Sequence, residues 1–261
     1  SWCFLKFSKD VAIGIILFSI FIYFGLTNMP WMPLILIYGL IGFKIGGLKL
    51  SLTIVASFLF ITFTGVLPQA LLSIYLCGIA VIISFILGSS LGIWAAHNDK
   101  VSAFMRPIND TMQTMPSFVI LIPFVMFFGI GEFTALLAII AYAFVPAMRY
   151  TEHGLRNLPE TVIEAARMIG CSQTQLLWEV KIPLAMPVIM LGLNQTIMFG
   201  LAMLVIAALV GTTGLGQLIY IGLSKADFGT GMISGVSIAL IAIIFDRTTQ
   251  AWRIKLEKKT Q

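Results

Sequence analysis

Residues 184–210 read LAMPVIMLGLNQTIMFGLAMLVIAALV, a run of 27 residues that contains no charged side chain. The hydrocarbon core of a bilayer is about 30 Å thick, and an α-helix crosses it with about 20 predominantly apolar residues. The run is long enough for such a crossing, so it predicts a transmembrane helix. The sequence on both sides of it determines which kind of membrane protein the chain forms.

Other apolar runs, separated by turn residues or charges, predict further membrane helices. The eight predicted spans are Val11–Thr27, Leu34–Phe43, Ser51–Val66, Leu71–Ala96, Ser117–Phe128, Phe133–Met148, Leu184–Val210 and Met232–Phe245. The second and fifth are short, so we expect their ends to extend into flanking segments or their axes to tilt. No small-residue cleavage site follows the first run, so we expect a retained helix and not a signal peptide.

The composition agrees with an all-α polytopic membrane protein. Of the 261 residues, 59% are hydrophobic and 10% are charged, and the mean hydropathy is +1.01. An average soluble domain has about 25% charged residues, so this chain has too few to cover a water-facing surface. A soluble enzyme and a nucleic-acid-binding protein are excluded on this ground. Because eight helices would occupy most of these 261 residues, we expect no separate ATPase or binding domain within them.

The distribution of basic residues predicts the orientation, because cytoplasmic loops of membrane proteins are enriched in Lys and Arg. If the N-terminus is cytoplasmic, 15 of the 16 basic residues fall in cytoplasmic segments and only Lys225 falls outside. The 15 are Lys6, Lys9, Lys44, Lys49, Lys100, Arg106, Arg149, Arg156, Arg167, Lys181, Arg247, Arg253, Lys255, Lys258 and Lys259. We therefore expect both termini in the cytoplasm.

Residues 149–183 form a polar island between two of the spans, with charges of both signs. Pro159 and Glu160 suit the start of a helix, and Gly170 suits a left-handed cap at its end. Ser172 and Gln175 have capping-box spacing and predict a second short helix, which Pro183 is expected to stop. Periodicity alone leaves two interpretations open: a helix that docks on a soluble partner, or one that lies on the membrane interface.

The island also carries a specific motif. Glu164–Ala165–Ala166, three residues, Gly170, nine residues and Val180–Lys181–Ile182–Pro183 resemble the EAA loop of ABC importer permeases. The resemblance implies a type I (MetI-like) permease core of five helices. It also implies that the loop is the coupling helix that contacts the ATPase subunit, with Glu160, Glu164, Ala165, Ala166, Arg167, Gly170 and Pro183 as the coupling residues.

A closer resemblance covers about residues 71–250. Leu91–Gly92–Ile93–Trp94–Ala95, Asp110–Thr111–Met112–Gln113–Thr114, Gly192–Leu193–Asn194–Gln195–Thr196 and Gly214–Leu215–Gly216–Gln217 are similar to the glycine betaine/proline betaine (ProW-type) permeases. This divides the chain into extra N-terminal helices (1–70), a permease core (71–250) with its coupling loop (149–183), and a cytoplasmic tail (251–261).

The resemblance implies the permease subunit of an ATP-driven importer for a quaternary-ammonium osmolyte such as glycine betaine, proline betaine or choline. The implied partners are two ATPase subunits, a substrate-binding protein and a second copy of the chain, in a bacterial inner membrane. ATP and Mg²⁺ are then held by the ATPases, and this chain binds no cofactor and catalyses no reaction. An amino-acid importer, such as one for methionine, shares the EAA loop and remains open. An ion-coupled secondary transporter is less favoured, because inverted repeats and intramembrane charges are not evident.

Polar residues within the spans are candidates for the translocation pathway, because an uncompensated amide is costly in hydrocarbon. Asn194, Gln195 and Thr196 lie in the middle of the seventh span, and Met198 and Tyr142 offer a soft and an aromatic surface. Hydrogen bonding between helices is an alternative role for the three polar residues.

The predicted outer segments hold candidates for an external gate or a dock for a binding protein. Glu132 lies between two predicted helices, and Gly214 and Gly216 belong to the glycine-rich segment 211–231. A solvated loop carboxylate is the alternative for Glu132. The cysteines and histidines have no metal-ligand spacing, so no metal site is predicted.

Overall fold

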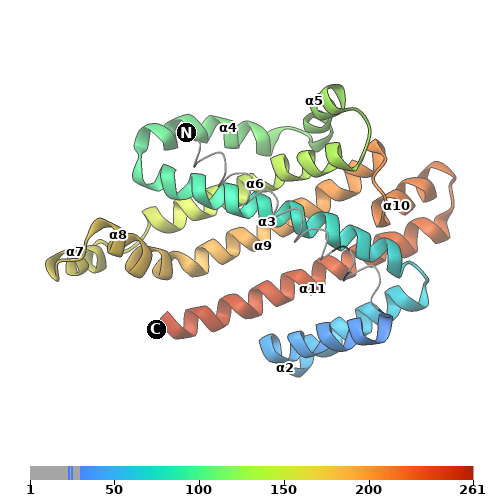
Figure 1. Ribbon diagram of the computed structural model, residues 1–261, viewed down its shortest axis with the longest axis horizontal. Helices are drawn as coiled ribbons and strands as arrows, with labels where there is room; N and C mark the ends of the chain where they lie inside the picture. The colour runs from blue at the N-terminus through green and yellow to red at the C-terminus, as the bar shows by residue number, and fades with distance from the viewer. Residues whose placement is uncertain (1–22, 24, 26–29, 261) are drawn as a thin grey trace, which may run out of the picture.

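The computed structural model describes Tyr23, Gly25 and residues 30–260, and the regular secondary structure of this part of the chain is entirely helical (Figure 1). The helices are α2 (Trp31–Phe63), α3 (Leu67–His97), α4 (Asp99–Thr114), α5 (Ser117–Phe128), α6 (Glu132–Arg156), α7 (Glu160–Met168), α8 (Gln173–Gln175), the π-helix η1 (Leu176–Lys181), α9 (Ile182–Ala207), the 3₁₀ turn η2 (Ala208–Val210), α10 (Leu215–Ser224) and α11 (Phe228–Thr260).

Five of these helices are long and apolar enough to cross a membrane, and the bent pair α4–α5 makes a sixth candidate. The predicted all-α membrane class is thereby confirmed for the described residues. The second to eighth predicted spans correspond in order to the two arms of α2, α3, the α4–α5 pair, α6, α9 and α11. The first predicted span, Val11–Thr27, lies outside the described residues except for Tyr23 and Gly25.

The second and third predicted spans form a helical hairpin within α2. The backbone leaves helical geometry at Gly47, where φ is 75°. The Ser51 hydroxyl then donates to the Gly39 carbonyl at 2.9 Å, a contact that twelve residues of straight helix would not allow. The first arm begins at Trp31, before the predicted Leu34, and the second arm ends at Phe63, before the predicted Val66.

Two helices were not expected from apolar runs. α4 carries Lys100, Arg106 and Asp110, which interrupt its apolar pattern, and α10 lies inside the glycine-rich segment. α5 has the predicted bounds, but it is bent by 102° from α4 across the Met115–Pro116 break. A residue before proline avoids the helical region, and Met115 has the extended ψ of 134° that this rule predicts.

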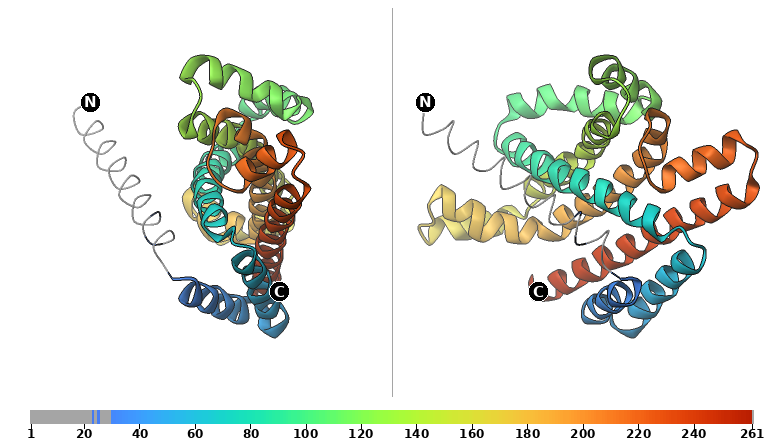
Figure 2. Two further views of the ribbon diagram at one scale, coloured as in Figure 1. Left: turned by 90° about the vertical axis from the view of Figure 1, so that its right-hand side faces the viewer. Right: turned by 45° about the vertical axis from the view of Figure 1, so that its right-hand side comes forward.

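The long helices α3, α6, α9 and α11 run side by side and carry the core (Figures 1 and 2). α3 approaches α6 closely through small residues: a Cβ atom on Gly88 would lie 2.6 Å from the Phe144 carbonyl oxygen, and one on Gly92 would lie 2.6 Å from that of Met148. The absence of a side chain at these two positions allows the close approach of the two helices.

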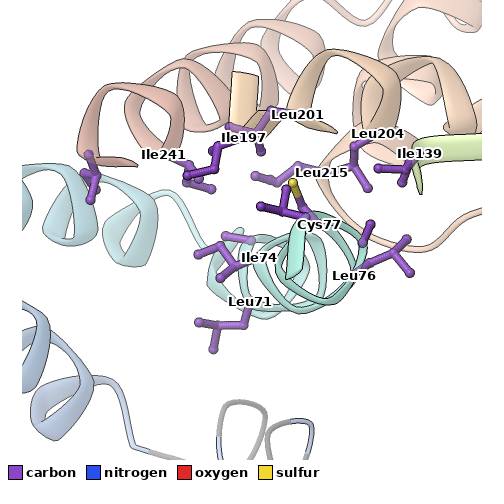
Figure 3. Packing of buried hydrophobic residues seen from close by; sticks show 14 of the residues in the cluster. Leu71, Ile74, Leu76, Cys77, Ile139, Ile197, Leu201, Leu204, Leu215 and Ile241 are labelled. Atoms are coloured by element: carbon purple, nitrogen blue, oxygen red, sulfur yellow. The ribbon is translucent and has the colours of Figure 1, made fainter. Parts of the chain in front are cut away.

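The main apolar cluster surrounds α3 (Figure 3). The labelled members come from α3, α6, α9, α10 and α11, and they are Leu71, Ile74, Leu76, Cys77, Ile139, Ile197, Leu201, Leu204, Leu215 and Ile241. A smaller cluster of Leu155, Ala185 and Ile189 joins α6 to α9 near α7. The core thus holds both ends of the bundle at fixed positions.

The turns divide between two ends of the bundle (Figure 1). The end that carries α7, α8 and the end of α11, here called the coupling end, also holds the Gly47 turn, because Lys255 Nζ donates to the Lys44 carbonyl. At the opposite end, the Leu215 amide donates to Ser73 Oγ at 2.8 Å. Of the described segments predicted to be cytoplasmic, the Gly47 turn, the 149–183 loop and the end of α11 therefore lie at the same end.

Candidate functional site

The predicted coupling loop begins with α7, which projects from the coupling end (Figure 1). Pro159 precedes the helix and Glu160 occupies its first turn. At its end, the Cys171 amide donates to the Ala166 carbonyl at 3.2 Å, and the Gly170 amide donates to that of Arg167 at 3.0 Å. These two bonds define a Schellman cap, which needs a left-handed residue, and Gly170 supplies it with φ of 90°.

The second half of the loop starts with the predicted capping box. The Gln175 amide donates to Ser172 Oγ at 3.3 Å, and the Ser172 amide donates to Gln175 Oε1 at 3.0 Å. The helix that follows does not stop at Pro183, and that prediction was wrong. It continues from Gln173 to Val210 as one candidate span, because the wider π-turn Leu176–Lys181 precedes Pro183 and relieves the ring of its clash with the preceding turn.

The surface of the coupling loop is mostly exposed. Glu164, Ala165 and Arg167 face outward, whereas Ala166 is buried. Met168 is 89% exposed and Ile169 is 84% exposed, and Trp178 is also exposed nearby on η1. We call Met168, Ile169 and Trp178 the apolar tip. An exposed apolar group on a loop that also carries charges is typical of an interaction surface.

A charged cluster connects the last turn of α6 to α3 and α4. Arg156 Nη2 donates to the Ala95 carbonyl at 2.6 Å, Nη1 lies 2.8 Å from Asp99 Oδ1, and Nε lies 3.1 Å from Glu152 Oε1. Glu152 also accepts a hydrogen bond from Ser102 Oγ, and its side chain is only 11% exposed. These five residues, called the Arg156 cluster, fix the root of the coupling loop.

Asn194 occupies the contact between α9 and α11. Its Nδ2 donates to Asp246 Oδ1 at 2.9 Å, and its Oδ1 accepts from Thr249 Oγ1 at 2.6 Å. Gln250 Nε2 also donates to Asp246 at 2.8 Å. In this structure Asn194 therefore forms hydrogen bonds between two helices, which is the alternative role considered for it.

The other pathway candidates do not gather around Asn194. Thr196 is buried and its hydroxyl donates to the Gly192 carbonyl one turn earlier at 2.8 Å. Gln195 and Met198 are half-buried. Tyr142, on α6, stacks on Phe199 of α9 with ring centroids 5.0 Å apart.

The candidates for an external gate lie together at the opposite end. Glu132, at the start of α6, accepts a hydrogen bond from Thr213, one residue before Gly214. A Cβ atom on Gly214 would lie 2.5 Å from Ser73 Oγ, and one on Gly216 would lie 3.0 Å from the Leu204 carbonyl oxygen. The glycine-rich segment is therefore packed tightly against α3 and α9.

No cluster of three or more His, Cys, Asp or Glu side chains that could hold a metal ion occurs in residues 30–260.

The sequence did not single out the Arg156 cluster, although the i, i+4 spacing of Glu152 and Arg156 on one helix was a usable signal. It also did not pair Arg149 with Asp110, whose charged atoms lie 3.3 Å apart, because 39 residues separate them along the chain.

Comparison with known proteins identifies the family. The family model described as "Binding-protein-dependent transport system inner membrane component" matches residues 88–252. The permease protein ProW of the glycine betaine/proline betaine transport system of Escherichia coli (strain K12) is 39% identical over 226 residues, which are 87% of this chain and 64% of that protein. The glycine betaine permease OpuAB of Bacillus subtilis (strain 168) is 36% identical over 98% of this chain and 90% of its own length.

Solved structures agree in fold. A chain of the MetNI methionine ABC transporter in an inward-facing conformation superposes with a TM-score of 0.65 at 18% identity, covering 75% of this chain and 97% of that one. A chain of an amino-acid ABC transporter gives a TM-score of 0.60 at 17% identity, with 75% and 98% covered. At such identities the likeness concerns the fold alone, which is that of MetI-like permeases.

The fold and the relatives together define a multi-pass permease of the inner membrane. The chain belongs to the family of binding-protein-dependent transport system inner membrane components. It spans 64% of the length of ProW and 31% of the length of the trimethylamine N-oxide permease TmoV of Pelagibacter ubique (strain HTCC1062), to which it is 42% identical.

Proposed function

We propose that the chain is the transmembrane subunit of an ATP-driven importer for a quaternary-ammonium osmolyte such as glycine betaine, proline betaine or choline. The observation that carries the proposal is the identity of 36–42% to permeases named for glycine betaine, proline betaine and trimethylamine N-oxide transport. These compounds all carry a nitrogen bearing methyl groups or ring carbons and no N–H donor. The methionine transporter supports an amino-acid substrate only through its fold.

The chain itself hydrolyses no ATP in this proposal. Two ATPase subunits, which hold ATP and Mg²⁺, dock on the coupling loop 160–183. The apolar tip supports this role, because Met168 and Ile169 are exposed at the point farthest along α7 and would be covered by a partner. Glu164 and Arg167 supply charges that orient the contact.

A homodimer encloses the pathway in this proposal, since one five-helix core provides half of it. The coupling end faces the cytoplasm, as the positive-inside rule predicts for its basic residues. A substrate-binding protein docks at the opposite end, near Glu132, Gly214 and Gly216. Closure of the ATPases moves the coupling loops, and the helices alternate between outward-facing and inward-facing states.

The substrate is tested by ATP-dependent uptake into proteoliposomes that contain the complete complex. Labelled glycine betaine, choline and methionine are supplied separately with the binding protein of the same system. Preferential uptake of a betaine or choline is expected. Preferential uptake of methionine, or uptake of a betaine without ATP, would refute the proposal.

The docking role is tested by replacing Gly170 with Leu. The residue has φ of 90°, a backbone conformation that side chains oppose, so the variant distorts the end of α7. Gly65→Leu is the matched control, because Gly65 has φ of 76° and free space around it but lies at the opposite end. Gly170→Leu is expected to insert into the membrane and lose the ATPase subunits, whereas Gly65→Leu retains them. Equal retention by both variants would contradict docking at α7.

A further inference from the structure

Two cavities open beside Arg149 at the coupling end, next to the Arg156 cluster. Their volumes are about 410 Å³ and 280 Å³, and both are lined by Arg149 and His153. The first lies between α4 and α6 and is also lined by Arg106, Asn109, Asp110 and Asn157, and by Glu152 and Arg156 of the Arg156 cluster. The second also contacts Gln113 and Tyr150. We call the two cavities together the Arg149 vestibule.

The charges of the vestibule lie side by side with opposite signs. Arg149 Nη1 lies 3.3 Å from Asp110 Oδ1 and donates to Gln113 Oε1. Both charged side chains remain about half exposed, so the pair can separate at low cost to admit a ligand. Arg106 is exposed and makes no ion pair with the described residues.

Asn109 adds an unsatisfied acceptor to the wall of the larger cavity. The residue is 2% exposed, and its Nδ2 is engaged with Met148 Sδ at 3.4 Å. Its buried Oδ1 has no hydrogen-bond partner among the described residues. A buried polar atom without a partner is uncommon in native proteins, and here the residue that carries it lines the vestibule.

Tyr150 contributes an aromatic surface to the smaller cavity. It is half-buried, and its Cβ packs so closely on α9 that a Cβ atom on Gly192 would lie 2.7 Å away. This contact holds the base of the side chain in place. An aromatic face attracts quaternary ammonium groups through cation–π interaction, which requires no N–H donor.

We propose that the Arg149 vestibule is a weak release site for a zwitterion that carries both a carboxylate and a quaternary ammonium group. The inference rests on the proposed function and extends it by naming residues that handle the substrate. The carboxylate pairs with the guanidinium groups of Arg106 and Arg149. The ammonium lies against Asp110 and the Tyr150 ring. When the zwitterion binds, its carboxylate replaces Asp110 as the partner of Arg149, and its ammonium replaces Arg149 as the partner of Asp110. Because the ligand has no net charge, no charge is left unpaired.

The position of the vestibule connects it to the coupling loop. Arg149 lies on α6 two turns before Arg156, and its partner Asp110 lies on α4. A displacement of α6 relative to α4 changes the separation of Arg149 and Asp110. The site is therefore placed to release its ligand when the coupling loop moves.

The test measures equilibrium binding to the purified permease–ATPase complex without the binding protein. The probes are glycine betaine, choline, which lacks the carboxylate, and 3,3-dimethylbutyrate, which replaces the ammonium nitrogen by carbon. Glycine betaine is expected to bind saturably, and each of the other two about tenfold more weakly, because each loses one charged contact. Absence of saturable glycine betaine binding, or equal binding of all three, overturns the proposal.

The variants assign the two ends of the ligand. Arg149→Gln is expected to weaken glycine betaine binding about tenfold and to leave choline binding unchanged. Asp110→Asn is expected to weaken glycine betaine similarly and to leave 3,3-dimethylbutyrate binding unchanged. Lys49→Gln removes a positive charge from the exposed Gly47 turn at the same end and is expected to change none of the three. A uniform loss for all probes in both variants would show a structural role and overturn the assignment.

Failure of this inference is distinguishable from failure of the proposed function. Uptake of glycine betaine by the complete complex that is unaffected by Arg149→Gln and by Asp110→Asn overturns the release site and leaves the osmolyte importer standing. Preferential methionine uptake by the wild-type complex overturns both. Arg149→Lys keeps the charge and is expected to retain part of the discrimination against choline.

Discussion

Replacing Arg156 by Met removes the centre of the Arg156 cluster while keeping most of the length of the side chain. The guanidinium contacts the Ala95 carbonyl, Asp99 and Glu152 at 2.6, 2.8 and 3.1 Å. Its loss leaves Glu152, with only 11% of its side chain exposed, supported by Ser102 alone. The variant therefore keeps a mostly buried carboxylate without its counter-charge.

The magnitude follows from the burial of the two partners. Breaking a fully buried ion pair costs about 3–5 kcal/mol, and an exposed pair contributes about 0–1 kcal/mol. Because the Arg156 side chain is 29% exposed, we expect about 2–3 kcal/mol, which corresponds to about 5–10 °C in melting temperature for a chain of this size. Arg247→Met is the control, since Arg247 is 64% exposed and lies 3.9 Å from Asp246.

The assay is thermal unfolding of the detergent-solubilised complex, combined with the ratio of substrate transported to ATP hydrolysed. Arg156→Met is expected to lower both, and Arg247→Met is expected to stay close to wild type in both. Glu152→Gln in the Arg156→Met background is expected to restore part of the stability, because it removes the unpaired charge. Equal melting temperatures for the two Arg→Met variants would refute the reasoning.

Three further predictions concern packing and capping. Gly92→Ala is expected to lower the stability in thermal unfolding by about 1–3 kcal/mol, because the added Cβ would meet the backbone of α6. Gly78→Ala is the control on the same helix, since that position has free space, and it is expected to be neutral or stabilising. Asn194→Leu removes the hydrogen bonds of the amide with Asp246 and Thr249 on α11 and is expected to cost about 2 kcal/mol in thermal unfolding; unchanged unfolding would contradict a structural role for its amide. Hydrogen bonds from the hydroxyl and amide of Thr230 hold the pKa of Asp227 below its ordinary value. The ionised Asp227 carboxylate therefore stabilises the start of α11 above about pH 4, and this stabilisation is lost as the pH falls through the lowered pKa. The measurement is the hydrogen-exchange protection of the first turn of α11 as a function of pH. The wild-type protein is expected to lose protection at acidic pH and Asp227→Asn is not, so an identical pH profile in both proteins would contradict the prediction.

The sequence predicted local features well where neighbouring residues alone determine them. The Ser172–Gln175 capping box and the Gly170 cap formed as their spacing indicated, because each depends on bonds within one helix turn. The Pro183 stop failed because the outcome depended on a π-turn in the preceding residues, and periodicity does not reveal such a turn. α4 was missed because its apolar face is interrupted by charges.

The membrane class and the spacing of the Glu164–Pro183 motif were determined by the sequence itself, since they follow from composition and from positions along the chain. The number of spans was not, because seven were predicted for the described region and the structure has five long apolar helices and one bent pair. Only the tertiary structure placed Asp110 beside Arg149 and joined Arg156 to Asp99, residues 39 and 57 positions apart. Such contacts depend on how α4 folds back along α6, and the geometry of that return is set by packing among helices. The same packing gave Asn194 its hydrogen-bond partners on α11, which its position in the span alone did not reveal.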